Sequence, residues 1–284
     1  MPLGPIIDSH VHLWDPTRFR MPWLDGNERI GKPFGLAEFR EHSAGIEVDG
    51  IVYLQVEVTP PYALLEAKWV ADLPPAGPPV LGIVPWAPLE DGDRARSFLD
   101  AMVAIDPRIK GIRRLYQTEP DLDFCIRPDF IRGVQILTEY GLSFDLGVFH
   151  QHLKNSITLV RACPEVSFVL DHIGKPDIKG KMQEPWRSEI RALASLPNVV
   201  CKVSGMVTEA DPETWTTEDL RPYIEHVLEA FGEDRVMFGG DWPVVLMGSS
   251  YRRWVESLDQ ITVGLSDGAK RKLWNENARR IYRL

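Results

Sequence analysis

Cysteine is scarce in this chain of 284 residues, and its three copies, Cys125, Cys163 and Cys201, lie far apart. An odd number of widely spaced thiols forms neither a disulfide framework nor a metal cluster of the Cys-x-x-Cys type. We therefore expect each cysteine to be a small buried apolar residue, in a protein that works in the reducing cytoplasm.

Positively charged residues are outnumbered by negatively charged ones. The chain has 32 Lys and Arg but 41 Asp and Glu, which gives a formal net charge of −9. Nucleic-acid binding needs clustered Lys and Arg, so this balance excludes nucleic acid as a partner. No apolar run approaches the roughly 20 residues that span a bilayer. The N-terminus has no basic segment of the signal-peptide kind. These absences predict a cytoplasmic protein with no membrane partner.

The sequence does have a regular alternation of short apolar runs and amphipathic segments. Such runs are typical of parallel strands covered on both faces, and the segments between them repeat with the period of a helix. The predicted strands are 6–14, 50–58, 80–86, 109–116, 142–150, 166–172, 199–205 and 235–241. The predicted helices are 36–44, 62–73, 94–105, 130–140, 157–162, 189–196, 220–231, 251–261 and 269–282.

Eight strand–helix units without a linker predict an α/β fold, a (β/α)8 barrel formed by one domain over residues 1–284. The alternative is a doubly wound open sheet, which is disfavoured because no glycine-rich phosphate loop follows the first strand. The strand C-termini of a barrel meet at one mouth, where active sites lie. The segment 15–33 is too long for an ordinary connection, and we expect it to cover that mouth or to pack as a surface loop.

Histidine is concentrated at the predicted strand ends. His10 and His12 alternate along the first strand and therefore share one face, with Asp8 below them. His150 and His172 end the fifth and sixth strands. Scattered core histidines have no reason to collect at one end of a barrel, so their joint arrangement predicts an enzyme active site.

Charged side chains end other strands. Asp241 follows the eighth strand and Glu57 lies near the end of the second. Arg113 and Arg114 are neighbours in the fourth strand, so one of them faces inward and the other outward. An inward Arg suits a carboxylate or the oxygens of a polyol, and its alternative role is a salt bridge beneath the rim.

Five segments carry a family resemblance: residues 7–16 (IDSHVHLWDP), 170–176 (LDHIGKP), 202–205 (KVSG), 238–243 (FGGDWP) and 277–282 (NARRIY). Together they resemble the amidohydrolase superfamily, in its amidohydrolase-2 branch. The chain is most similar to the small sugar-lactone hydrolases of that branch, such as the L-fuconolactonases and L-rhamnonolactonases. The 2-pyrone-4,6-dicarboxylate lactonases resemble it more distantly.

The resemblance implies that His10, His12, His172 and Asp241 occupy catalytic positions. Asp241 would take a proton from water that attacks the carbonyl of an L-fucono-lactone-like substrate, while the imidazoles stabilise the oxyanion. His150 matches the strand-five position, for which His152 competes. The residues expected to bind the substrate are Trp14, Trp23, Arg113, Arg114, His150 and Lys175.

No cofactor is required by this expected chemistry, because a lactone is an activated ester. The fourth strand has arginines where the two-metal members of the superfamily carry a bridging Lys or Glu. A single divalent ion such as Zn²⁺ stays open, with His10, His12, Glu57 and His150 as its expected ligands.

Other readings of the same residues stay open. A mononuclear zinc hydrolase or a non-oxidative decarboxylase of a small carboxylated substrate would use the same barrel mouth. A non-catalytic barrel that binds a sugar acid would not need Asp241. The sequence also leaves assembly into a homo-oligomer open.

Overall fold

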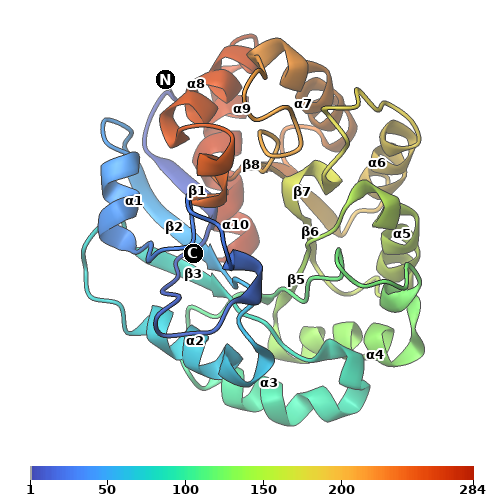
Figure 1. The fold of residues 1–284 in the computed structure, drawn as a ribbon. Coiled ribbons are helices and arrows are strands. Elements are labelled where there is room, and N and C mark those ends of the chain that lie inside the picture. Colours follow the sequence, from blue (N-terminus) through green and yellow to red (C-terminus); the bar gives the residue numbers. More distant parts are fainter. Residues whose placement is uncertain (1) are drawn as a thin grey trace.

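The fold is a barrel of eight parallel strands surrounded by helices (Figure 1), and the computed structural model describes residues 2–284 of it. The strands are β1 (Ile6–Val11), β2 (Val48–Leu54), β3 (Val80–Val84), β4 (Gly111–Ile112), β5 (Ser143–Leu146), β6 (Phe168–Leu170), β7 (Val199–Val203) and β8 (Val236–Phe238). The helices that follow them are α1 (Leu36–His42), α2 (Ala63–Ala71), α3 (Ala95–Val103), α4 (Pro128–Ile136), α5 (Leu153–Ala162), α6 (Trp186–Ala194), α7 (Thr217–Phe231) and α8 (Tyr251–Ile261). The predicted (β/α)8 barrel is confirmed.

Two hydrogen-bonded sheets, β1–β3 and β4–β8, are joined at two seams. One seam is a parallel bridge between Ile83 of β3 and Ile109, two residues before β4. At the other, Val11 of β1 pairs with Trp242 beyond β8, and the amide of Asp241 donates to the carbonyl of His10 at 2.8 Å. The second seam therefore holds the segments that carry His10 and Asp241 side by side.

The C-terminal helix α10 (Asn277–Tyr282) closes the barrel from inside. Its Ala278 and Tyr282 are buried with a small apolar cluster made of Ile7, Val52, Leu54, Val84, Val169 and Met237. This burial explains why the C-terminus lies within the ring of helices in Figure 1. A larger apolar core fills the layer between the strands and the outer helices, and the three cysteines are buried, as predicted.

Several strands and helices are shorter in the structure than the sequence predicted. The predicted strand 109–116 is reduced to Gly111–Ile112, and 166–172 to Phe168–Leu170. The residues beyond these short strands leave the hydrogen-bonded ladder and turn toward the mouth. The predicted helix 269–282 is divided into α9 (Asp267–Arg271), a π-helical turn (Lys272–Glu276) and α10.

The prediction that Asp8 lies below His10 is wrong. Between Asp8 and Val11, three steps along β1 oppose two steps along β2, so β1 contains a bulge. A bulge shifts the alternation of side chains by one residue. Asp8 therefore faces α8, where it accepts a hydrogen bond from the hydroxyl of Tyr251 at 2.9 Å.

The segment 15–33 lies across the mouth of the barrel, as its length suggested. The indole N–H of Trp23 donates to the carbonyl of Val56, beyond β2, at 2.7 Å. The guanidinium of Arg29 donates to the carbonyl of Met247, beyond β8, at 2.7 Å. The segment thereby ties together the loops that follow β2 and β8.

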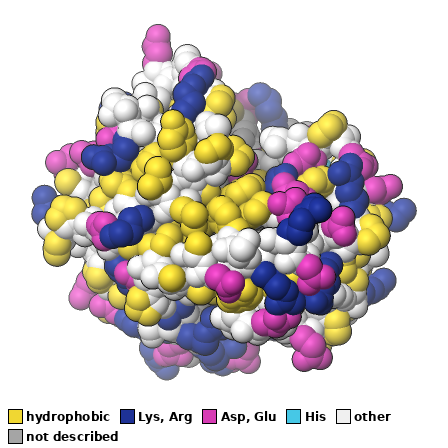
Figure 2. Space-filling model, turned by 90° about the horizontal axis from the view of Figure 1, so that it is seen from below, with side chains coloured by type: hydrophobic (Ala, Val, Ile, Leu, Met, Phe, Trp, Pro, Cys, Tyr) yellow, Lys and Arg dark blue, Asp and Glu magenta, His cyan; other side chains and the backbone are white. Residues whose placement is uncertain are grey.

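The face formed by α2, α3 and α4 carries apolar side chains among charged ones (Figure 2). Leu65 of α2 is 57% exposed there. Exposed apolar residues of this kind are ordinary on globular proteins. None of the helices formed by residues 2–284 is long and apolar enough to cross a membrane.

Packing of α4 against the turn Leu89–Arg94 gives a first prediction. A Cβ added at Gly133 would lie 2.0 Å from the carbonyl oxygen of Leu89. Gly-to-Ala changes usually stabilise a helix by about 1 kcal/mol, but here we expect overpacking to destabilise the protein by about 1–3 kcal/mol. Urea unfolding should show this loss for Gly133→Ala.

Gly264→Ala is the control for this measurement, because a Cβ at Gly264 meets no atom within 4 Å. Its free energy of unfolding should stay close to that of the unaltered protein. A Gly133→Ala variant as stable as Gly264→Ala would contradict the close approach of α4 to the Leu89 backbone.

Candidate active site

The C-terminal ends of the strands surround a cavity of about 280 Å³. Catalytic sites of (β/α)8 barrels lie at this end. The polar lining side chains include His12, Glu57, Arg113, His172, Lys175 and Asp241. Apolar walls come from Trp23, Val56, Leu115 and Val244.

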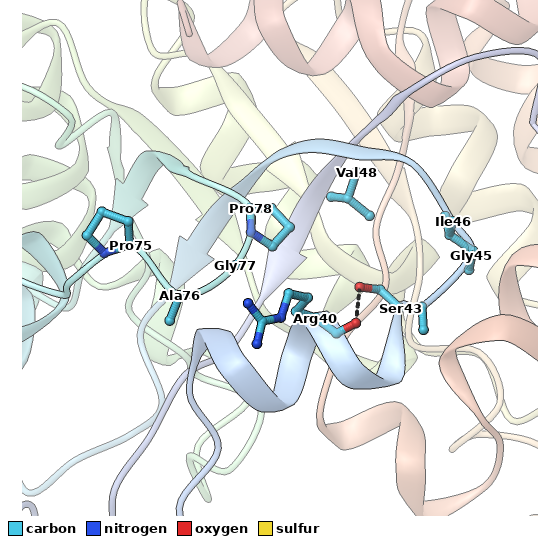
Figure 3. A pocket seen from close by; sticks show the side chains of 10 residues that line it. Arg40, Ser43, Gly45, Ile46, Val48, Pro75, Ala76, Gly77 and Pro78 are labelled. Atoms are coloured by element: carbon cyan, nitrogen blue, oxygen red, sulfur yellow. Dashed lines mark hydrogen bonds between the residues drawn. The ribbon is translucent and has the colours of Figure 1, made fainter.

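A larger groove of about 580 Å³ lies at the opposite end of the barrel (Figure 3). It runs between the end of α1 and the segment 75–78, close to Val48, where β2 begins. Among the residues that the structure describes, Arg40 is the one charged side chain in its lining, and Ser43 donates to the Arg40 carbonyl at 3.4 Å. Its described lining residues include no Asp, Glu, His, Lys or Cys, in contrast to the cavity at the strand C-termini.

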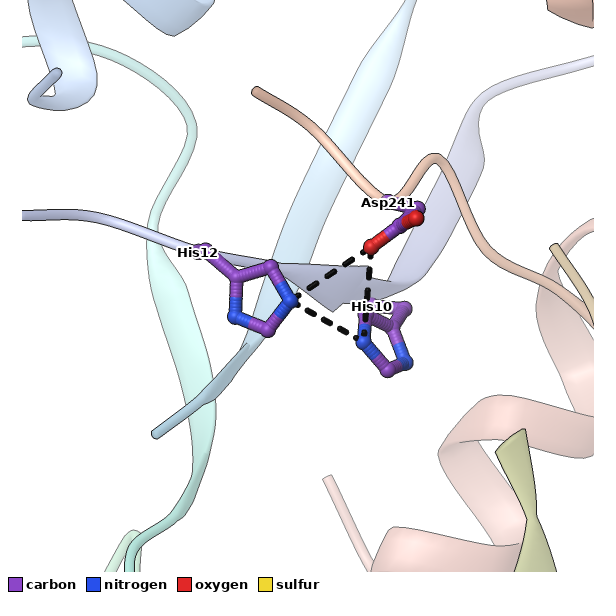
Figure 4. Close-up of side chains that lie close together, drawn as sticks. All are labelled: His10, His12 and Asp241. Carbon is purple, nitrogen blue, oxygen red and sulfur yellow. Dashed lines mark hydrogen bonds and ion pairs between the residues drawn. The ribbon is translucent and has the colours of Figure 1, made fainter. Parts of the chain in front are cut away.

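Three imidazoles converge on a single carboxylate oxygen in the cavity. Oδ1 of Asp241 lies 3.4 Å from Nε2 of His12, 3.7 Å from Nε2 of His10 and 3.8 Å from Nε2 of His172. The Nε2 atoms of His10 and His12 are 3.2 Å apart, and Figure 4 shows both rings turned toward Asp241. The structure thus brings together the four residues expected to be catalytic.

Left-handed backbone turns aim several of these side chains into the cavity. Glu57, His172 and Asp241 have φ values of 54°, 55° and 52°. This conformation costs a non-glycine residue about 1–3 kcal/mol, and it persists where the surroundings impose it. Close to His172 the chain has Gly205, where a Cβ would lie 2.4 Å from Nδ1 of the imidazole. The glycine makes room for the ring.

Hydrogen bonds to the far side of two rings set their orientation. Nδ1 of His12 lies 2.9 Å from the carbonyl oxygen of Leu54. A carbonyl can only accept, so Nδ1 of His12 carries a hydrogen, and Nε2 faces Asp241. Nδ1 of His172 is held by the hydroxyl of Ser204 at 2.8 Å. Both rings therefore present Nε2 to the cavity.

The imidazoles are neutral because they are buried beside cations. Burial lowers the pKa of His12, and it lowers the pKa of His10 and His172 well below the usual range. The charge of Lys202 lowers the pKa of His10 further, and the neighbouring His10 ring lowers that of His172. Neutral imidazoles can accept a proton, donate a hydrogen bond or bind a metal.

A buried set of charges lies directly beneath His10. Oδ1 of Asp171 lies 3.3 Å from Nδ1 of His10 and 3.0 Å from Nζ of Lys202. Oδ2 of Asp171 accepts from Arg113 at 3.2 Å. Burial alone raises the pKa of Asp171, but the charges of Lys202 and Arg113 outweigh it and lower that pKa. Asp171 is therefore an anion that holds two cations and the His10 ring.

The donor set fits one divalent metal ion. Nε2 of His10, Nε2 of His12 and Oδ1 of Asp241 are 3.2–3.7 Å apart. Ligand atoms about 2.0–2.1 Å from a tetrahedral Zn²⁺ are about 3.4 Å from one another. Against a metal stands the guanidinium of Arg113, whose Nη1 lies 3.2 Å from Nε2 of His10.

Two of the predicted metal ligands lie outside this group, which corrects the predicted set. The carboxylate of Glu57 accepts from the side-chain amide of Gln55 at 2.9 Å. His150 begins a short 3₁₀ turn, His150–His152, beyond β5 and is absent from the described cavity lining. Asp241 takes their place because the seam between β1 and β8 brings it beside His10.

The predicted substrate-binding residues divide into two sets. Trp23, Arg113 and Lys175 line the cavity. Lys175 donates to Oε1 of Gln117 at 2.9 Å, and its position above the Phe149 ring keeps it at the mouth. These three residues remain candidates for substrate contact.

The other three are corrected by the structure. Arg114 faces outward and pairs with Glu90 at 2.9 Å and Glu119 at 2.7 Å. Trp14 is 1% exposed and packs behind Trp23, with ring centroids 5.3 Å apart. His150 lies beyond the end of β5, outside the cavity. None of these three residues is among the described residues that line the cavity.

Sequence analysis missed two carboxylates that support the site. Asp145 lies inside β5 and Asp171 immediately follows β6, both fully buried. A charged residue within an otherwise apolar strand is the signal that marks them, since burial of a lone charge is unfavourable. Lys202, in β7, is their shared partner.

Comparisons with known proteins identify the family of the chain. A sequence model of the amidohydrolase family matches residues 7–284. An L-fucono-1,5-lactonase from Burkholderia multivorans is 30% identical over 98% of this chain and 96% of its own. Another from Burkholderia ambifaria is 28% identical over 98% of this chain and 95% of its own.

A solved structure extends the likeness to three dimensions. The crystal structure of an amidohydrolase from Burkholderia multivorans with bound Zn has a TM-score of 0.86 to this structure. It is 27% identical and covers 99% of this chain and 100% of its own. With a family match that spans almost the entire sequence, the protein belongs to the amidohydrolase family.

Proposed function

We propose that the protein hydrolyses a sugar lactone, L-fucono-lactone-like in its chemistry, to the free sugar acid. The observation that carries this proposal is the convergence of three buried neutral imidazoles on the carboxylate of Asp241. A carboxylate among proton acceptors and donors is suited to moving the proton of a water molecule. The two relatives named L-fucono-1,5-lactonase support the choice of a lactone.

Asp241 acts as the general base in this proposal. Its Oδ1 takes a proton from a water molecule as the water oxygen attacks the lactone carbonyl carbon. The ester bond then breaks, and the protonated Asp241 returns the proton to the ring oxygen that leaves as an alcohol. The left-handed turn at Asp241 holds the carboxylate in the cavity throughout, so little reorganisation is required.

Fixed donors stabilise the charge that develops on the carbonyl oxygen. Arg113 and Lys175 present cationic groups to the cavity, and His172 presents an imidazole. Burial lowers the pKa of Lys175, which makes its ammonium a better proton donor. One preorganised donor is worth about 2.7–4 kcal/mol of transition-state stabilisation in other hydrolases.

The cavity also has the groups that bind a polyhydroxylated ring. Trp23 offers an aromatic face, and Glu57, Gln117 and Thr118 offer hydrogen-bonding side chains. These polar groups favour a substrate whose hydroxyls form hydrogen bonds with them, because a substrate without hydroxyls would leave them unpaired.

A metal ion is not required in this proposal. His10, His12 and Asp241 would hold Zn²⁺, which would supply a Lewis acid for the carbonyl oxygen. Arg113 already places a positive charge beside Nε2 of His10, and like charges repel. The alternative is a mononuclear zinc hydrolase, favoured by the solved relative with bound Zn.

Asp241→Asn should abolish most turnover while the fold is retained. Loss of a general base lowers the rate by a factor on the order of 10²–10⁴. Initial rates with a sugar lactone, followed through a pH indicator for released acid, measure the loss. Asp211→Asn is the control, because Asp211 pairs with Lys179 outside the cavity. Near-normal kcat in Asp241→Asn would remove Asp241 from the role of base.

The enzyme should prefer a sugar lactone to an unsubstituted lactone of the same ring size. The expected ratio of kcat/KM is on the order of 10² or more, since a site that pairs with hydroxyls discriminates by up to 10⁴–10⁵. Competition between the two lactones in one assay gives this ratio directly. Equal values would show that the hydroxyl-binding groups of the cavity play no part in recognition.

Activity should persist after removal of divalent metal. The protein is treated with a chelator until elemental analysis finds less than about a tenth of an equivalent, and it is assayed at once. We expect more than about half of kcat to remain, because Arg113, Lys175 and His172 supply the oxyanion donors. Activity that falls in step with metal content and returns with Zn²⁺ would establish the zinc hydrolase instead.

A further inference from the structure

A buried chain of polar contacts runs from the C-terminal helix to His10. The hydroxyl of Tyr282 donates to Oδ2 of Asp145 at 2.5 Å, and the same oxygen accepts from Nζ of Lys202 at 2.7 Å. Nζ of Lys202 lies 3.0 Å from Asp171 and 3.4 Å from Nδ1 of His10. All five side chains are 0% exposed. This series of contacts therefore runs through the barrel interior, from α10 to the mouth.

Packing alone does not account for this arrangement. Inside the barrel Tyr282 also belongs to an apolar cluster, which includes Ile7 and Met237. Replacement of buried ion groups by well-packed apolar residues is often neutral or stabilising. A plug of aliphatic side chains would therefore close the barrel without Asp145 and Lys202. The charges of Asp145 and Lys202 are better explained by their effect on the position of the His10 ring.

We propose that Tyr282 is a positioning residue for the lactone hydrolysis proposed above. Its hydroxyl restrains Asp145, which in turn fixes the ammonium of Lys202 between Asp145 and Asp171. Lys202 and Asp171 together fix Nδ1 of His10. His10 then presents Nε2 to His12 and Asp241 in the cavity.

Tyr282→Phe isolates the hydroxyl from the rest of the side chain. The ring remains, and with it the contact of Nζ of Lys202 5.3 Å from the ring centroid. Asp145 also keeps Lys202, and its other oxygen keeps Ser143 at 3.4 Å. The variant therefore loses one hydrogen bond and no charge.

We expect Tyr282→Phe to lower kcat about tenfold and to change KM by less than about twofold. Partners that orient a histidine from behind are typically worth about 10–100-fold in activity. The matched control is Tyr53→Phe, which also removes a buried hydroxyl that donates to a buried carboxylate, Glu66, at 2.7 Å. Tyr53→Phe should keep the kcat of the unaltered protein.

A second readout is independent of substrate and of metal. In chelator-treated protein labelled with ¹⁵N-histidine, the ring nitrogens of His10 are assigned from the spectrum of a His10→Asn variant. Tyr282→Phe should shift the ¹⁵N signals of the His10 ring. The ¹⁵N signals of His226, whose Nε2 lies 2.9 Å from the Arg187 carbonyl oxygen, should not shift. Because no lactone is added, this readout stands even if the protein hydrolyses another kind of substrate.

Three outcomes would overturn the proposal. One is unchanged His10 signals together with unchanged kcat, another is an equal loss of kcat in Tyr53→Phe, and the third is a rise in KM at constant kcat. Should Tyr282→Phe fail to fold, Asp145→Asn takes its place, since the amide keeps an acceptor for Tyr282. It is judged by the same two readouts and against the same control.

Discussion

The contact of Asp171 with Lys202 and Arg113 is the interaction on which the rest of the site depends. Asp171 lies 3.0 Å from one cation and 3.2 Å from the other, and none of the three is more than 4% exposed. Removing a partner from such a set leaves an uncompensated buried charge, which costs about 3–5 kcal/mol. The set therefore holds its geometry firmly. His10 inherits this rigidity, because Asp171 and Lys202 contact one ring nitrogen and Arg113 the other.

The backbone after β6 has an unusual conformation that directs side chains into the cavity. The residues His172, Ile173, Gly174 and Lys175 all have positive φ, from 44° to 73°. A left-handed run of this length is unfavourable for ordinary residues, by roughly 1–2 kcal/mol at each. It is held by the indole N–H of Trp186, which donates to the Ile173 carbonyl at 2.8 Å. The result is that His172 and Lys175, three residues apart, both line one cavity.

Sequence periodicity predicted the barrel because strand and helix periods are local properties of the chain. It predicted His10, His12, His172 and Asp241 as neighbours because parallel strand ends must meet. The positions of His150 and Trp14 depended on the path of the chain beyond the strand ends. Two other outcomes depended on one residue of register within a strand. The bulge in β1 sent Asp8 to α8, and the parity of β4 decided between Arg113 and Arg114. Such choices depend on the neighbouring strand, which no local pattern reveals.

The same charges bear on the proposed hydrolysis of an ester without an added electrophile. In the proposed hydrolysis, negative charge develops on the substrate carbonyl oxygen within the cavity of about 280 Å³. Arg113 is tied to Asp171, and Lys175 to Gln117, so both cations are fixed before the charge arrives. Fixed groups in a water-poor site stabilise a developing charge without the reorganisation that solvent requires. In the proposed reaction, these fixed groups at the strand ends would supply the electrostatic stabilisation that a bound metal ion provides in metal-dependent hydrolases.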